Sequence, residues 1–240
     1  MIMKQSSHRK KGFTLIELLV VITIIGILAG IAIGPMGDIL FNTSRTAAGK
    51  DLQTMFNTVR NKDISKFRWP GKEKLGGAQE IAVWVCQQDP QMSKTSIWFL
   101  SKDPALELFE DDEGAKIPEQ ITKEKGSLDD VKEAFGYCVA VPAGLSGKIP
   151  DSESGIFPVM WTRGLEAGQT EWAEDSPWEG EGGHVLYSNG TVEWYDNTKG
   201  EDDKGVFKKF LKKGSDEQDS MTTDIKQAIP ENWEILSPSS

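Results

Sequence analysis

Residues 13–33 form an unbroken apolar run, FTLIELLVVITIIGILAGIAI, in which the side chain of Glu17 is the only ionisable group. At ~1.5 Å per residue, a helix of this length crosses the ~30 Å hydrocarbon layer of a bilayer. The sequence therefore predicts a membrane-spanning helix, which we place at residues 13–35. Four basic residues and no acid precede it, so residues 1–12 are expected to stay in the cytoplasm while the remainder crosses.

An ordinary secretory signal is the competing interpretation of this run, with cleavage among the small residues at 29–32. The apolar region of such a signal is ~7–15 residues long and uncharged. This run is longer and has an acid in its first turns, which favours the membrane anchor.

The charge of the chain is unevenly distributed. The formal net charge is −10, and because residues 1–12 contribute four positive charges, the remainder is close to −14. An acidic body repels phosphate groups, and the one basic cluster in it, at residues 208–213, is short. Nucleic acid is therefore not expected as a partner.

Glu17 requires an explanation, because a carboxylate near the membrane interior costs ~2.5–3.5 kcal/mol on insertion scales. The apolar helix is expected to offer it no partner. Two explanations remain open: the side chain snorkels to the interface, or the chain is cut after Gly12. Such a cut creates a positive amine on Phe13, four residues before Glu17 and on the same helix face.

Residues 11–18, Lys-Gly-Phe-Thr-Leu-Ile-Glu-Leu, resemble the signature of type IV prepilins and of the pseudopilins of type II secretion. The resemblance implies that a prepilin peptidase cuts between Gly12 and Phe13 and N-methylates Phe13. It also implies that Glu17 acts in subunit docking during filament assembly. The implied partners are the peptidase, other pilin-like subunits and an assembly platform with a cytoplasmic ATPase. The implied location is the bacterial inner membrane, with a periplasmic body, and then a filament.

The same resemblance implies an α+β, pilin-like fold, in which a long N-terminal helix packs its second half on a C-terminal antiparallel sheet. The expected organisation is a leader at 1–12, a long helix at 13–62 and a globular body at 63–240. Apolar and small side chains at spacings of three and four support the helix beyond the membrane. They are Leu40, Phe41, Ser44, Ala48, Leu52, Met55, Phe56 and Val59.

Glycine and proline punctuate the predicted helix. The segment Gly-Pro-Met-Gly at 34–37 predicts a kink, because proline removes a backbone hydrogen bond. Gly26, Gly30 and Gly34 repeat every four residues. This spacing predicts a face on which helices approach closely, the alternative being the ordinary tolerance of glycine in lipid.

Short apolar runs in the body predict strands at 81–86, 96–100, 137–141 and 159–162, and residues 128–135 predict a short helix. The clearest element is a hairpin at 185–195, because Asn189-Gly190 lies between alternating apolar residues; both are expected to have positive φ. This region resembles the C-terminal segment of large pilin-like proteins, in which an Asp-Gly turn follows glycines. Asn189 and Thr191 depart from that pattern, so we expect a structural role.

The inventory of side chains argues against an enzyme. Once the leader is removed, His184 is the only histidine, and its two glycine neighbours predict a turn or surface position. The spacing of Cys86 and Cys138 does not fit a zinc site; they form either one disulfide or two buried thiols. The acidic clusters at 111–113 and 201–203 are expected to be solvated loops. We expect no catalytic residue, metal or cofactor.

Two classes of function remain. The first is a structural filament subunit. The second is a membrane-tethered binding module or minor tip subunit that recognises carbohydrate or protein, and the tryptophans between residues 161 and 194 favour it.

Overall fold

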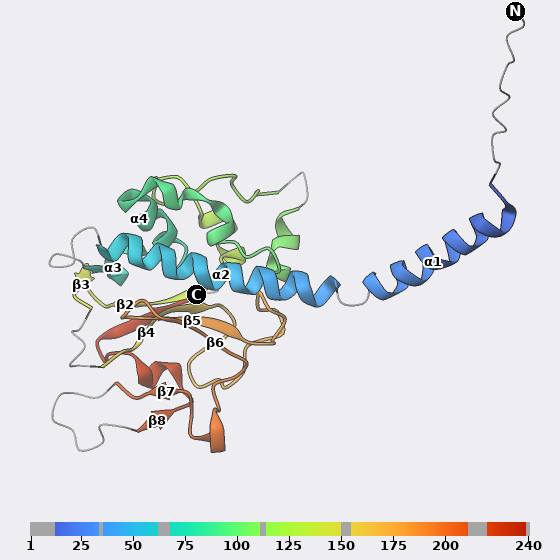
Figure 1. Ribbon diagram of the computed structural model, residues 1–240. Coiled ribbons are helices and arrows are strands. Elements are labelled where there is room, and N and C mark those ends of the chain that lie inside the picture. Colours follow the sequence, from blue (N-terminus) through green and yellow to red (C-terminus); the bar gives the residue numbers. More distant parts are fainter. Residues whose placement is uncertain are drawn as a thin grey trace, which may run out of the picture. The chain divides into compact units, whose positions relative to one another are not determined.

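The structure is a computed structural model that describes residues 13–33, 36–61, 68–110, 114–149, 155–210 and 220–238. The chain divides into two compact units, Met1–Thr43 and Ser44–Ser240. The first contains helix α1 and the start of helix α2, and the second is the body (Figure 1).

The long N-terminal helix is described as α1 (Leu15–Ile33) and α2 (Met36–Asn61). The described part of α2 ends at Asn61, and the predicted end near residue 62 lies outside the described residues. The predicted interruption includes residues 34 and 35, which lie outside the described residues. The apolar and small side chains listed above, from Leu40 to Val59, have two environments in α2. Leu40 is 57% exposed, whereas those from Ala48 onward are buried in the body.

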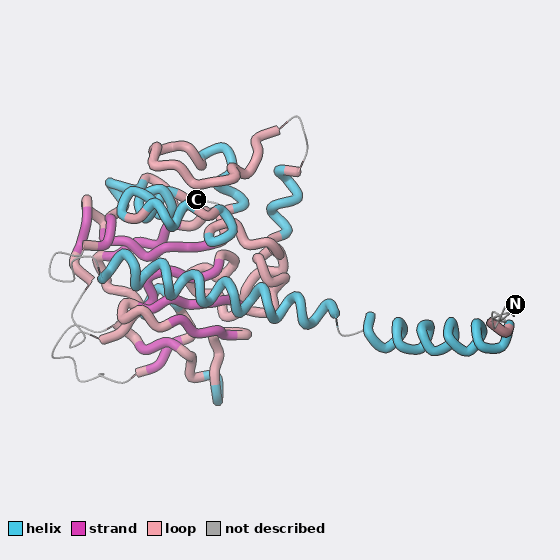
Figure 2. The backbone as a smooth tube through the Cα atoms, turned by 45° about the horizontal axis from the view of Figure 1, so that its top comes forward, coloured by secondary structure: helices cyan, strands magenta, loops and turns pink. Residues whose placement is uncertain are grey.

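Five strands form the main sheet of the body, in the order β6-β5-β4-β2-β9, and all neighbours are antiparallel. They are β2 (Tyr137–Pro142), β4 (Pro158–Thr162), β5 (Gly183–Tyr187), β6 (Val192–Tyr195) and β9 (Trp233–Leu236). Every position of β2 and β4 is buried, so the core lies against the middle of the sheet. Figure 2 shows α2 running across these strands. The predicted α+β architecture, which is consistent with a pilin-like fold, is confirmed.

Smaller elements complete the body. Two further strand pairs are β1 (Trp69–Pro70) with β3 (Ser146–Gly147), and β7 (Phe207–Lys208) with β8 (Met221–Thr222). The helices are α3 (Lys72–Leu75) and α4 (Glu80–Gln88), with 3-10 helices η1 (Pro90–Ser93), η2 (Thr95–Ile97), η3 (Pro104–Phe109), η4 (Asp129–Ala134), η6 (Glu201–Asp203) and η7 (Ile225–Ala228).

Trp69 joins the helical and sheet parts of the core. Its ring centroid lies 5.8 Å from that of Phe56 on α2 and 5.9 Å from that of Trp84 on α4. Its indole Nε1 donates a 2.9 Å hydrogen bond to the carbonyl oxygen of Ala140 on β2. The indole therefore fills apolar volume while its polar atom is satisfied.

The strand predictions were right at 137–141 and 159–162, and the short helix at 128–135 is the 3-10 helix η4. They were wrong at 81–86, which lies in helix α4, and at 96–100, which overlaps the 3-10 helix η2 and contains no strand. Every residue from Glu80 to Cys86 is buried, so the helix has no polar face. A continuous apolar run without periodicity does not distinguish a strand from a buried helix.

The predicted hairpin is present as β5 and β6, but its turn differs from the expected one. The carbonyl oxygen of Tyr187 accepts from Gly190 N at 2.8 Å, and Tyr187 N donates to the carbonyl oxygen of Thr191 at 2.9 Å. Gly190 has φ +91°, whereas Asn189 is not among the described residues with positive φ. Asn189 Oδ1 instead accepts from Thr191 N at 2.9 Å. The loop therefore contains three residues, 188–190, instead of the two expected. In a loop of this length, glycine alone has a positive φ.

The tip of this hairpin lies against α2. Arg60 Nη1 donates a 2.9 Å hydrogen bond to the carbonyl oxygen of Asn189. A Cβ added to Gly190 would lie 2.8 Å from Asn57 Oδ1. The glycine is therefore required both by its φ and by the close approach of the helix.

Candidate functional site

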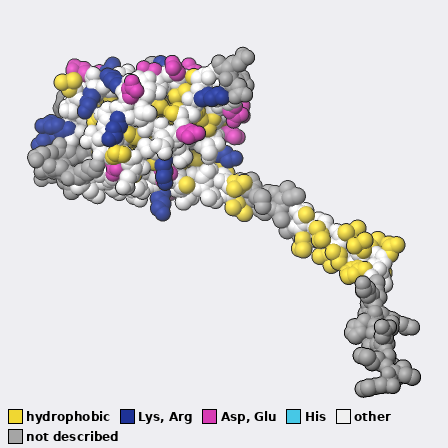
Figure 3. Space-filling view, turned by 90° about the horizontal axis from the view of Figure 1, so that it is seen from above, with side chains coloured by type: hydrophobic (Ala, Val, Ile, Leu, Met, Phe, Trp, Pro, Cys, Tyr) yellow, Lys and Arg dark blue, Asp and Glu magenta, His cyan; other side chains and the backbone are white. Residues whose placement is uncertain are grey.

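The surface of α1 is apolar on all sides. Its large apolar side chains from Leu15 to Leu28 range from 43% exposed at Val21 to 82% exposed at Leu15. Figure 3 shows these side chains gathered along α1. A helix that is apolar all round requires apolar surroundings, supplied by lipid or by other helices.

The polar groups at the start of α1 form a capping box. Thr14 N donates to Glu17 Oε2 at 2.8 Å, and the Thr14 hydroxyl donates to the same oxygen at 2.7 Å. In return, Glu17 N donates to Thr14 Oγ1 at 3.3 Å. This reciprocal pair satisfies backbone N–H groups that the first turn of a helix leaves without partners.

The expectation that the helix offers Glu17 no partner was therefore wrong. The helix begins at Leu15, so Thr14 is its N-cap and lies within reach of Glu17. The sequence contained the signal, because threonine followed three residues later by glutamate ahead of an apolar run is a capping-box pattern. Thr14 is the residue that the sequence analysis missed.

Phe13 and Glu17 lie on one face of α1. Together with Ile16, Val20 and Val21 they line a shallow concavity of about 330 Å³. The side chain of Phe13 is 77% exposed. Gly12, the other residue of the predicted cleavage site, lies outside the described residues.

The glycine face of α1 is open. Around both Gly26 and Gly30, no described atom lies within 4 Å of an added Cβ. Gly34 lies outside the described residues. Close helix packing on this face stays a prediction.

Within the described residues, no helix is both long enough and apolar enough to cross a membrane. The predicted span, 13–35, ends in two residues outside that part of the chain.

Cys86 on α4 and Cys138 on β2 are both buried free thiols. Cys86 Sγ donates to the carbonyl oxygen of Met92 at 3.3 Å. Burial raises the pKa of Cys86 to about 11 and that of Cys138 to about 12. Both thiols therefore stay protonated at neutral pH, the unreactive form.

His184 lies in the core on β5 and is 5% exposed, so the expected turn or surface position was wrong. Its ring centroid lies 6.0 Å from that of Trp178 and 4.9 Å from that of Trp194. Nδ1 is buried and has no hydrogen-bond partner among the described residues. Burial, with a smaller contribution from Arg45, lowers the pKa of His184 to about 4. The imidazole is therefore neutral at physiological pH.

The tryptophans that suggested a ligand site are mainly core residues. Trp161, Trp172 and Trp178 are at most 4% exposed. Trp194 is half-buried, and the guanidinium of Arg45 lies 3.7 Å from the centroid of its ring. The feature that favoured a carbohydrate-binding module is therefore used in packing.

Of the two acidic clusters, one lies in the described part of the chain. Residues 111–113 lie outside the described residues, and residues 201–203 form η6. Across the part of the chain that the structure describes, no three histidine, cysteine, aspartate or glutamate side chains are placed to hold a metal ion together.

Comparison with protein families identifies the N-terminal segment. Residues 7–33 match the family model of the prokaryotic N-terminal methylation motif. This prepilin-type motif is typical of type IV pilins and of type II secretion pseudopilins. Neither the curated proteins nor the solved structures gave a match. The motif implies a pilin-like subunit that is processed by a prepilin peptidase, in a class that is generally structural and non-enzymatic.

Proposed function

We propose that this protein is a structural subunit of a type II secretion pseudopilus or a type IV pilus-like filament, assembled through α1. The observation that carries the proposal is the start of α1, where Phe13 and Glu17 share one face of an apolar helix within the matched motif. The all-round exposure of apolar side chains on α1 supports packing in lipid first and against other subunits later.

In the proposed sequence of events, α1 anchors the unprocessed subunit in the inner membrane with the body in the periplasm. The peptidase cuts between Gly12 and Phe13 and methylates the new amine, which stays positively charged. The processed subunit then enters a filament driven by a cytoplasmic ATPase. Gly26, Gly30 and Gly34 form the face on which neighbouring helices approach closely.

The capping box gives Glu17 a specific role in this assembly. Both hydrogen bonds from Thr14 end on Oε2, and no described residue donates to Oε1. An ionised carboxylate accepts about four hydrogen bonds in all. Oε1 is therefore available to the charged amine of Phe13 on a neighbouring subunit, while Oε2 remains bonded to the helix end.

Processing is tested by intact-mass analysis of protein from membranes of the native host. We expect a chain that begins at Phe13 with one added methyl group. A bulky Gly12→Leu substitution should block cleavage by crowding the peptidase site. An intact Met1, or a chain beginning near residue 33, would contradict the proposal.

Assembly is tested with three substitutions that separate the charge of Glu17 from its capping. Thr14→Val removes the cap but keeps the carboxylate, whereas Glu17→Gln keeps an acceptor for Thr14 but removes the charge. Glu17→Val removes both and should also improve membrane retention, because an insertion cost of ~2.5–3.5 kcal/mol disappears. The measured quantity is incorporation into filaments when each variant is co-expressed with wild type.

We expect Thr14→Val subunits to assemble, and Glu17→Gln and Glu17→Val subunits to fail. Equal assembly of Glu17→Gln and wild type would show that charge pairing is wrong. Failure of Thr14→Val alone would show that capping matters instead. Immunogold labelling of the filaments, at the cell surface or within the periplasm, distinguishes the two filament systems.

A further inference from the structure

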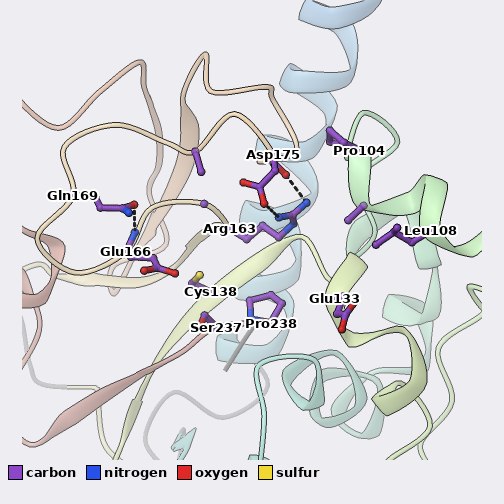
Figure 4. Close-up of a pocket in the computed structure, with 13 residues that line it drawn as sticks. Pro104, Leu108, Glu133, Cys138, Arg163, Glu166, Gln169, Asp175, Ser237 and Pro238 are labelled. Atoms are coloured by element: carbon purple, nitrogen blue, oxygen red, sulfur yellow. Dashed lines mark hydrogen bonds and ion pairs between the residues drawn. The ribbon is translucent and has the colours of Figure 1, made fainter.

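The body contains a cavity of about 530 Å³ that the proposed assembly through α1 does not use. Its walls come from η3, from η4, from the loop at 164–175 and from Ser237 and Pro238 after β9. Figure 4 shows these segments converging around Arg163 and Cys138. The volume lies within the ~300–1,000 Å³ range of pockets that bind small ligands.

Arg163 is fixed at the base of the cavity by charge-assisted hydrogen bonds. Its Nε donates to Asp103 Oδ2 at 2.9 Å, and its Nη2 donates both to Asp103 Oδ1 and, at 2.7 Å, to the carbonyl oxygen of Asp175. The Asp103 side chain is fully buried, and that of Arg163 is 12% exposed. This bidentate pair holds the base rigid and neutralises Arg163, the one cationic side chain among the described residues that line the cavity.

The remaining charged groups of the lining are carboxylates. Glu133 comes from η4, and Glu166 and Asp175 come from the loop at 164–175. In Figure 4, Glu166 and Glu133 lie on opposite sides of Arg163. The side chains of Glu133 and Glu166 make no hydrogen bond or ion pair with any described residue. With Arg163 already paired, the excess of carboxylates in the lining favours a cation over an anion, although Glu133 and Glu166 are both exposed.

Hydrogen bonds keep the loop at 164–175 in place. Gln169 Oε1 accepts from Glu166 N at 3.2 Å, and Gly168 N donates to Asp224 Oδ1 at 3.0 Å. Gly164 has φ +99°, and a Cβ there would lie 2.6 Å from that of Ser176. The carboxylates are therefore presented by an ordered scaffold, which reduces the entropy cost of binding.

Apolar groups line the same cavity. Pro104, Ala105 and Leu108 belong to η3, and Pro238 lies after β9. Leu108 is 66% exposed. The lining therefore suits a ligand that combines an aliphatic stem with a positive head group.

We infer that this cavity binds a lysine or arginine side chain presented by a partner polypeptide. The stem packs on Pro104, Leu108 and Pro238, and the positive head group is attracted by the carboxylates of Glu133 and Glu166. The proposal is independent of the filament proposal, because none of its residues lies in α1.

The test measures binding of blocked pentapeptides to the full-length protein in detergent micelles by isothermal titration calorimetry. The lysine probe is acetyl-Ala-Ala-Lys-Ala-Ala-amide, and norleucine at the central position gives a matched probe with a stem but no charge. The variant Glu133→Gln/Glu166→Gln leaves Asp175 and the Arg163 pair intact. The control variant, Glu119→Gln/Glu124→Gln, makes the same change in net charge at exposed positions outside the cavity.

We expect the lysine probe to bind at least about tenfold more tightly than the norleucine probe. The cavity variant should weaken lysine binding about tenfold or more, and the control variant less than twofold. Absence of binding, equal binding of the norleucine probe, or equal weakening by the control variant would overturn the inference. n-Butylamine binding as tightly as the lysine probe would overturn the assignment to a polypeptide and indicate a small-amine site.

Discussion

Mild acid is expected to destabilise the body through His184. Burial among Trp178, Trp194 and helix α2 lowers the pKa of this imidazole from an ordinary 6.5 to about 4. The unfolded chain therefore takes up a proton at a pH where the folded chain does not. Since a tenfold difference in proton affinity is worth ~1.4 kcal/mol, the neutral imidazole contributes about 3 kcal/mol of pH-dependent stability.

The sign of the effect follows from the lowered pKa. The contribution is fully present above pH 6.5 and is lost progressively as the pH falls from 6.5 to about 4. Protonation in the folded state would place a second positive charge close to Arg45 in the core. Between pH 6.5 and about 4, protonation of His184 therefore favours the unfolded state, and folding favours the neutral imidazole.

The assay compares wild type with His184→Gln, a non-titrating polar replacement, by urea unfolding in mild detergent at pH 7.5 and 4.5, followed by tryptophan fluorescence. Other titrating groups act in both proteins, so the difference between them isolates His184. Between the two pH values, wild type should lose ~2–3 kcal/mol more unfolding free energy than the variant. Equal losses would refute the reasoning, as would an NMR titration in which His184 protonates near pH 6.5.

Three further perturbations address the body. Gly190→Val should destabilise the body by at least ~1 kcal/mol, because valine resists the positive φ and its Cβ would meet Asn57 Oδ1. Thermal unfolding measures this loss. Gly144→Val is the control, because a Cβ added at Gly144 has no atom within 4 Å. Arg163→Met should cost ~3–5 kcal/mol in urea unfolding, because it leaves the buried carboxylate of Asp103 unpaired; a loss below 1 kcal/mol would contradict a buried pair. Deleting residues 1–36 should leave a soluble, folded monomer by circular dichroism and size-exclusion chromatography, and an aggregated product would contradict two separable units.

The sequence predicted those elements whose physical signal is local. The spacing of apolar residues in α2 is a property of a single helix, so the sequence alone predicted a helix beyond the apolar run of residues 13–33. Glycine at position 190 marked the hairpin because few other residues accept its φ. The strand β2 was predictable because its apolar residues are flanked by turn residues.

The errors arose where tertiary packing decides the outcome. Residues 80–86 of helix α4 are all buried, so the apolar run has no helical period. The burial of His184 depends on α2 and on tryptophans distant in sequence, whereas its glycine neighbours suggested a turn. The cavity around Arg163 is assembled from four separate segments, and none of them has a motif of its own.

The hydrogen bonds between Thr14 and Glu17 have a consequence for the supply of subunits. A carboxylate that accepts hydrogen bonds from the end of its own helix has a lower free-energy cost in hydrocarbon than a carboxylate without hydrogen bonds. In the proposed pathway, an idle subunit therefore persists in the bilayer without a bound neighbour. On this proposal, the membrane acts as a reservoir of subunits from which a filament can grow.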